Sequence, residues 1–274
     1  MYQIKNLLEN DDIRVLTELG PFTVIEYLRD LSVSPANAAT AYFASEMNVR
    51  RRQVICDLKK ANITLQAGAM QWMAGDVSAT TGIKGAGDFL SKTIRGKVTG
   101  ESVIKPEYTG DGTLVLEPTY KHIILLDLDE WGNSIVLDDG LFLACESTLK
   151  QKAVRRKTFS SAFVGGEGFF NLGLKGSGVV CIESDCSREE LVEITLEDDV
   201  VKIDGNLAIA WSGSLDFTVE RAGKSLLGSA ASGEGLVNVY RGTGKVLLAP
   251  VGNQAMKPQQ VIEKEPVIVG DDDE

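Results

Sequence analysis

The chain has 274 residues, 43% of them hydrophobic, and its 39 acidic and 28 basic side chains give a formal net charge of −11. This charge disfavours a general nucleic-acid binder, because lysine and arginine must displace the counterions of phosphates. A chain of this length buries roughly three-quarters of its unfolded surface, so it needs no disulfide or metal to fold. No apolar stretch reaches the roughly 18 residues of a membrane-spanning helix. We therefore expect a soluble, cytoplasmic protein whose four cysteines, which form no C-x-x-C pair, are reduced.

Residues 1–50 are predicted to form a small N-terminal extension with one strand and one helix. The strand is expected at residues 22–27, directly after Gly20 and Pro21. Ser34 and Pro35 then start a helix, because serine caps an N-terminus well and proline suits the first turn. The alanine-rich segment that follows, to about Met47, has no internal glycine and carries the strongest helical signal of the chain.

Residues 51–250 contain a pattern that recurs three times. It starts with Gly-Glu, continues through an extended run to a Gly-x-Gly turn and ends in an apolar strand. The Gly-Glu pairs start at Gly100, Gly166 and Gly233, which lie 66 and 67 residues apart. The turns start at Gly110, Gly176 and Gly242, and both of their intervals are 66 residues. So constant a period indicates a repeated structural unit, here the repeats 53–118, 119–184 and 185–250.

The repeats predict an all-β fold. Apolar and polar residues alternate over 215–220, as in a half-buried strand, whereas residues 123–126 are continuously apolar, as in a strand covered on both faces. We expect the three β-rich units to surround a pseudo-threefold axis, as a β-sandwich or a double-stranded β-helix-like assembly. Such closure would remove exposed strand edges, and the chain would resemble a fused homotrimer. Residues 251–274 are predicted to be an acidic tail.

Five segments carry a resemblance to a known family: 47–53, 68–72, 120–125, 210–217 and 233–237. They are similar to the family named for altered inheritance of mitochondria protein 24, over about residues 50–250. The resemblance implies a β fold like that of the tryptophan RNA-binding attenuation protein, whose small subunit has the size of one repeat. Bacterial members are soluble and of unassigned function, whereas the yeast namesake is mitochondrial and linked to inner-membrane organisation. The family motif supplies no catalytic residue.

One acidic side chain recurs once per repeat, at Glu101, Glu167 and Glu234. If the repeats surround an axis, these carboxylates would converge on it and form an axial site. Alternatively, each accepts backbone N–H bonds within its own turn. His122 is the only histidine, and its position at the start of an apolar strand favours a structural role over a catalytic one. We predict no cofactor, no metal and no catalytic residue.

Three functions remain open at this point. The favoured one is a non-enzymatic binding or scaffold protein with an unknown protein or small-molecule partner, because the residues that the repeats share are glycines and apolar strands. The alternative is a small-ligand binder or enzyme that uses a cleft between repeats, with Trp131 or Trp211 at its mouth. RNA binding is less favoured, since fold analogy is a weak basis for function and the negative charge opposes it. The sequence does not predict an oligomeric state.

Overall fold

The computed structural model describes residues 2–81, 105–155, 170–221 and 236–250. In these residues the chain forms mostly antiparallel strands, with one α-helix and two short 3₁₀ helices. The all-β class is therefore confirmed. The N-terminal half contains β1 (Ile13–Leu19), β2 (Phe22–Tyr27), α1 (Ala38–Glu46), β3 (Arg52–Asp57), β4 (Ile63–Leu65), β5 (Met70–Thr80), β6 (Glu107–Leu116) and β7 (His122–Asp127). The remainder contains β8 (Ser134–Leu137), β9 (Phe142–Glu146), β10 (Lys150–Arg155), β11 (Phe170–Lys175), β12 (Val179–Ser184), β13 (Val192–Asp204), β14 (Ala208–Ser212), β15 (Asp216–Arg221) and β16 (Leu236–Leu248).

The strands form two curled sheets. The first has the order β1-β2-β3-β6-β4-β9-β12-β7, with β5 paired to β6. The second has the order β10-β11-β8-β14-β16-β13, with β15 paired to β16. The middle repeat is thus divided: β7, β9 and β12 belong to the first sheet, and β8, β10 and β11 to the second.

The same strand pairing recurs in the three predicted repeats, and the Gly-x-Gly turns lie where a strand changes partner. In the middle repeat, β11 pairs with β10 before Gly176, and β12 pairs with β9 after it. In the last repeat the single strand β16 pairs with β15 before Gly242 and with β14 after the turn. Strand β6 contacts the two halves of β5 in the same way around Gly110. The φ angles of these glycines are +134°, +117° and +125°, a region that side chains disfavour.

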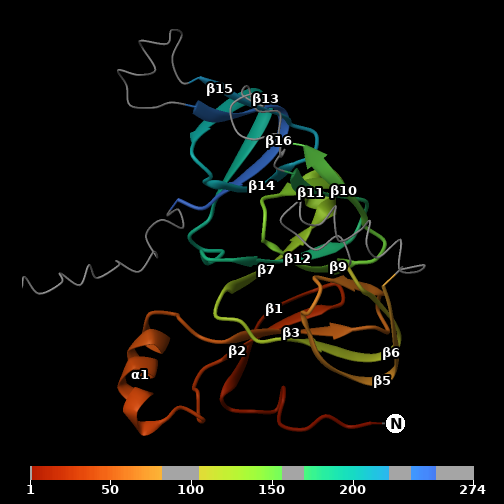
Figure 1. The fold of residues 1–274 in the computed structure, drawn as a ribbon, viewed down its shortest axis with the longest axis vertical. Coiled ribbons are helices and arrows are strands. Elements are labelled where there is room, and N and C mark those ends of the chain that lie inside the picture. The colour runs from red at the N-terminus through yellow and green to blue at the C-terminus, as the bar shows by residue number, and fades with distance from the viewer. Residues whose placement is uncertain (1, 82–104, 156–169, 222–235, 251–274) are drawn as a thin grey trace, which may run out of the picture.

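Neighbouring repeats are joined through equivalent strands. Strand β4 of the first repeat pairs with β9 of the second, and β8 of the second pairs with β14 of the third. Among the described residues, no strand pairing joins the third repeat to the first, and Figure 1 shows the repeats in a row along the long axis of the molecule. The expected pseudo-threefold arrangement is therefore not confirmed by strand pairing and stays a prediction. The N-terminal hairpin β1–β2 pairs with β3, and the first sheet curls until β1 contacts β7.

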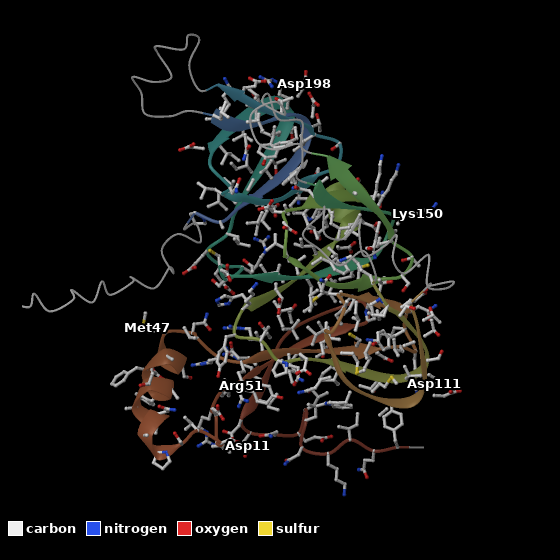
Figure 2. The ribbon with its side chains drawn as sticks, in the orientation of Figure 1. Asp11, Met47, Arg51, Asp111, Lys150 and Asp198 are labelled. Carbon is white, nitrogen blue, oxygen red and sulfur yellow. The ribbon has the colours of Figure 1, made fainter. Side chains whose placement is uncertain are left out.

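The predicted N-terminal helix is present as α1, preceded by a 3₁₀ turn at Pro35–Asn37. It is linked to the segment just after β2 through Ser45, whose hydroxyl donates to the Leu28 carbonyl at 3.3 Å. Its outer side exposes large apolar side chains. Phe43 and Met47 are 67% and 77% exposed, and Figure 2 shows Met47 at the C-terminal end of the helix, from which the chain continues toward β3.

A buried ion cluster fixes the end of the helix to the first sheet. The Glu26 carboxylate, on β2, contacts the guanidinium groups of Arg14 at 2.7 Å, Arg50 at 3.2 Å and Arg52 at 2.8 Å. Glu26 and Arg52 are only 1% and 2% exposed. Arg52 also donates to the backbone carbonyl of Asn48 just beyond α1. One carboxylate therefore connects β1, β2, β3 and the segment after the helix.

Candidate binding cleft between the second and third repeats

The predicted axial site falls outside the part of the chain that the structure describes. Glu101, Glu167 and Glu234 each lie, in sequence, between the two strands of an equivalent hairpin: β5 and β6, β10 and β11, or β15 and β16. Their convergence on an axis stays a prediction. The described residues place a candidate site elsewhere.

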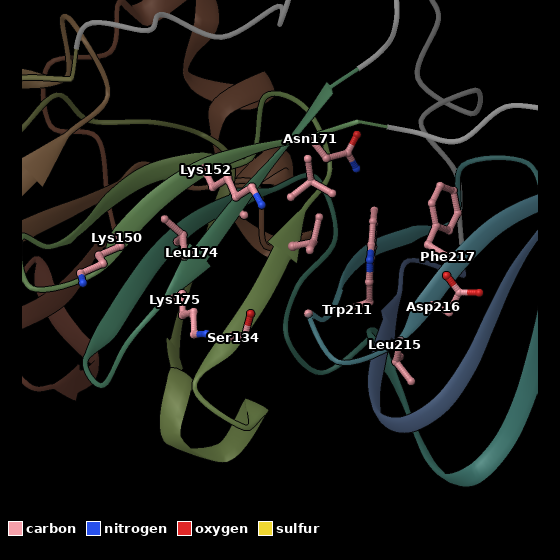
Figure 3. A pocket seen from close by; sticks show the side chains of 14 residues that line it. Ser134, Lys150, Lys152, Asn171, Leu174, Lys175, Trp211, Leu215, Asp216 and Phe217 are labelled. Carbon is pink, nitrogen blue, oxygen red and sulfur yellow. The ribbon is translucent and has the colours of Figure 1, made fainter. Parts of the chain in front are cut away.

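A cleft of about 370 Å³ lies between the second and third repeats. One wall comes from β8, β10 and β11 of the second repeat, and the other from β14, β15 and the turn between them. Figure 3 shows the lysines of the first wall opposite the aromatic residues of the second. The cleft exists because β8 pairs with β14, which brings the two hairpins side by side. Its volume falls in the range of small-molecule sites.

The wall from the third repeat is aromatic. Trp211 packs against Phe217 and Tyr240, with ring centroids 5.3 Å from each, and Phe217 and Tyr240 are 5.1 Å apart. Trp211 and Phe217 line the cleft together with Leu215. Trp211 thus lines the cleft but is only 3% exposed, so it lies in the wall and not at the mouth. Trp131 is buried in a core cluster and does not line the cleft. A ligand site between repeats stays a prediction at this point.

The opposite wall is basic. Lys150 and Lys152 of β10 and Lys175 of β11 all line the cleft. Side chains two residues apart on a strand share a face, and Lys150 is directly opposite Lys175 in the strand pair. The three amino groups therefore belong to one face of the β10–β11 hairpin. Sequence reasoning missed this group, because Lys175 joins the other two only once the register of the hairpin is known.

A second hollow, of about 790 Å³, lies between α1 and the first sheet. Its three arginines are each in an ion pair. Arg29 pairs with Asp12, Arg50 with Glu26, and Arg51 with Asp30. Each positive charge of this hollow is thus neutralised by a carboxylate of the protein. The cleft differs, because its lysines have no such partner among the described ion pairs.

The cysteines are packing residues rather than nucleophiles. All four are buried free thiols. Burial raises the pKa of Cys145 to about 12 and raises the pKa values of Cys56 and Cys181 well above their usual range. Because the reactive form is the thiolate, these protonated side chains act as small apolar groups.

His122 is half-buried at the start of β7. Burial lowers its pKa, and the nearby Arg52 guanidinium lowers it further, whereas Glu190, Glu189 and Glu26 act in the opposite direction. The imidazole is therefore neutral in the folded protein at a pH where an exposed histidine would already be charged.

The free energy of unfolding should consequently fall as the pH drops below about 6.5, the usual pKa of histidine. In this window the unfolded chain binds a proton that the folded chain does not, and this difference favours unfolding. Because His122 is the only histidine, His122→Gln should flatten the decline between pH 7 and 5.5. Thermal denaturation of both proteins across this range tests the effect. If the unfolding midpoints of the two proteins fell in parallel with pH, the prediction would be wrong.

No helix within the described residues is long and apolar enough to cross a membrane. These residues also contain no group of three or more His, Cys, Asp or Glu side chains that could hold a metal ion.

Fold and cleft together define an all-β protein built from tandem antiparallel hairpin units, with a lysine- and tryptophan-lined cleft between two of them. The family described as Mitochondrial biogenesis AIM24 matches residues 46–251, and the chain belongs to this family. The resemblance found in the sequence is thereby confirmed.

Two streptococcal proteins illustrate the similarity. An uncharacterized protein of Streptococcus pyogenes serotype M6 is 31% identical over 194 residues, which cover 68% of this chain and 76% of that protein. The X-ray crystal structure of a Streptococcus pyogenes protein is 28% identical and matches with a TM-score of 0.54, over 75% of this chain and 90% of that one. The likeness to the attenuation protein stays a prediction.

Proposed function

We propose that this protein is a non-enzymatic binding protein that holds a small organic ligand in the cleft between its second and third repeats. The observation that carries the proposal is the cleft itself, in which an aromatic wall from one repeat faces a basic wall from the next. Small-molecule sites combine mainly apolar linings with a few polar groups in this manner. Of the functions that the sequence left open, this one has a described cavity to support it.

The chemistry of the lining favours binding over catalysis. The described residues that line the cleft include no histidine and no cysteine. The Ser134 hydroxyl is there without an imidazole to activate it, since His122 lies on β7 and is not among the lining residues. Nucleophilic catalysis needs a nucleophile within hydrogen-bond reach of a base.

A cytoplasmic location is part of the proposal. All four cysteines are free and buried, and free thiols persist in a reducing compartment. The formal charge of −11 still argues against RNA as the ligand, because a phosphate backbone would meet a net negative field.

A thermal-shift screen of small metabolites tests the proposal. A ligand of the cleft should raise the midpoint of wild-type unfolding by about 5 °C or more at roughly 100-fold excess over its Kd. The increase should disappear in Phe217→Ala, which removes part of the aromatic wall. Phe43→Ala is the matched control, because Phe43 is exposed on α1 and outside the cleft. Equal stabilisation of both variants would place the ligand elsewhere and overturn the proposal.

A further inference from the structure

We infer that the ligand of the cleft is an organic dianion of the phosphomonoester type, with its phosphate on the lysine wall and a flat apolar group on the wall that contains Trp211. This inference rests on the proposed function and adds the ligand class to it.

Lys150 and Lys175 are direct neighbours across the β10–β11 hairpin. Like charges at such a position destabilise a strand pair. Lys152, two residues along on the same face, adds a third positive charge. Its cross-strand partner is Gly173, which has no side chain to offset the charge.

The equivalent positions of the other repeats avoid this repulsion. In the first repeat the residue just before the turn glycine is Thr109; it pairs with Ser78, and their hydroxyl groups are 3.1 Å apart. In the third repeat it is Arg241, which pairs with Asp216. The equivalent hairpins therefore form with a neutral pair in one repeat and with an oppositely charged pair in another. The two lysines of the second repeat are not required by the fold.

The lysine charges also lack a carboxylate partner in the described structure. None of the described ion pairs or hydrogen bonds involves the side chains of Lys150, Lys152 or Lys175. By contrast, Arg241 at the equivalent place is paired with Glu220 at 2.6 Å. The only carboxylate among the lining residues described is Asp216, which sits on the opposite wall, across the strand pair from Arg241.

Three ammonium groups on one face of a hairpin suit a compact anion of more than one charge. Lysine acts on phosphate as a point charge, and a phosphomonoester carries a charge of about −1.5 to −2 at pH 7. The facing wall of Trp211, Phe217 and Leu215 offers apolar surface for the rest of the ligand. In the view of Figure 3, Lys152 and Lys175 lie nearer to Trp211 than Lys150 does.

Isothermal titration at pH 7.5 and constant ionic strength tests the inference with three probes. Phenyl phosphate carries both features, inorganic phosphate only the charge, and phenol only the ring. Phenyl phosphate should bind wild-type protein more tightly than either of the other two. The variant Lys150→Asp should weaken its binding by about tenfold or more, because the new carboxylate would engage Lys175 and remove two cations from the cleft.

The same variant gives a second, independent readout. In the absence of ligand, Lys150→Asp should unfold at a higher temperature than wild type. The substitution places opposite charges across the strand pair, as Asp216 and Arg241 do in the third repeat. The control is Lys121→Asp, an exposed substitution outside the cleft lining that changes the net charge equally. It should leave binding of phenyl phosphate unchanged.

Specific outcomes would overturn the inference. If phenol binds in a Phe217-dependent manner and phenyl phosphate binds no better, the cleft is a ligand site but not an anion site, so the proposed function survives alone. If Lys150→Asp unfolds at a lower temperature and still binds phenyl phosphate, the lysines serve the fold. Tighter binding of a short single-stranded RNA than of phenyl phosphate, lost in Lys150→Asp, would assign the surface to nucleic acid instead.

Discussion

Glu26→Gln should lower the free energy of unfolding by roughly 3–5 kcal/mol, the cost of breaking a buried ion pair by removing one partner. The substitution keeps the size of the side chain but leaves Arg52, which is 2% exposed, without its carboxylate partner. Arg14 and Arg50, which share the same carboxylate, would add repulsion between like charges. Thermal unfolding should therefore shift downward by about 10 °C.

The matched control is Glu220→Gln. Its carboxylate also holds an arginine, Arg241, through two short contacts of 2.6 and 3.0 Å, but this pair lies at the surface of the third repeat. Exposed ion pairs contribute little because water screens them, so the midpoint should scarcely move. If the two substitutions lowered the midpoint of unfolding by similar amounts, burial would not be the reason that the Glu26 cluster stabilises the fold.

Gly110→Ala should be strongly destabilising, and more so than the same change at Gly242. Both glycines start a Gly-x-Gly turn, and their φ angles of +125° and +117° are nearly equal. The conformational cost of a Cβ in this sparsely populated region, about 1–3 kcal/mol, is thus shared. At Gly110 the new methyl group would also collide with the backbone carbonyl oxygen of Asp76, whereas at Gly242 its nearest neighbour is a Leu215 methyl carbon at 3.8 Å.

Urea denaturation of the two variants separates these contributions. The decrease in the free energy of unfolding caused by Gly242→Ala measures the conformational cost. The further decrease in Gly110→Ala measures the steric cost, which we expect to be about 1–3 kcal/mol, as at other overpacked sites. Equal losses would mean that β5 can move away from β6 without cost. The comparison is possible because the repeats place the same turn in different surroundings.

Features with a local cause could be predicted from the sequence. The helix after Pro35 follows from proline in the first turn and from alanine content, and α1 begins three residues after Pro35. The expected serine cap is wrong, because the Ser34 side chain makes no capping hydrogen bond and Asn37 is the residue that precedes α1. The turn glycines follow from their regular spacing, and the structure shows why they are needed, since Gly110, Gly176 and Gly242 all have positive φ. Such signals depend only on neighbouring residues, and they are strong.

Features that depend on distant contacts could not be predicted. The sequence of β1 gives no sign that this strand pairs with β2 and reaches β7. Most of its side chains are exposed, so no buried face marks it as part of the sheet. The lysine wall illustrates the same limit. Lys150 and Lys152 are two residues apart and so share a face of a strand, but which face Lys175 shares depends on the register between β10 and β11. The position of Trp211 opposite them depends on pairing between repeats.

The division of the middle repeat between the two sheets has a consequence for how the molecule unfolds. In solenoid proteins each repeat contacts only its neighbours, so units can melt one after another. Here the second repeat supplies three strands to each sheet, and its apolar side chains, such as Leu126 on β7 and Leu137 on β8, belong to one buried cluster. Melting it would open both sheets at once. The predicted repeats are therefore not separate units of stability, and cooperative loss of the whole β structure is the expected transition.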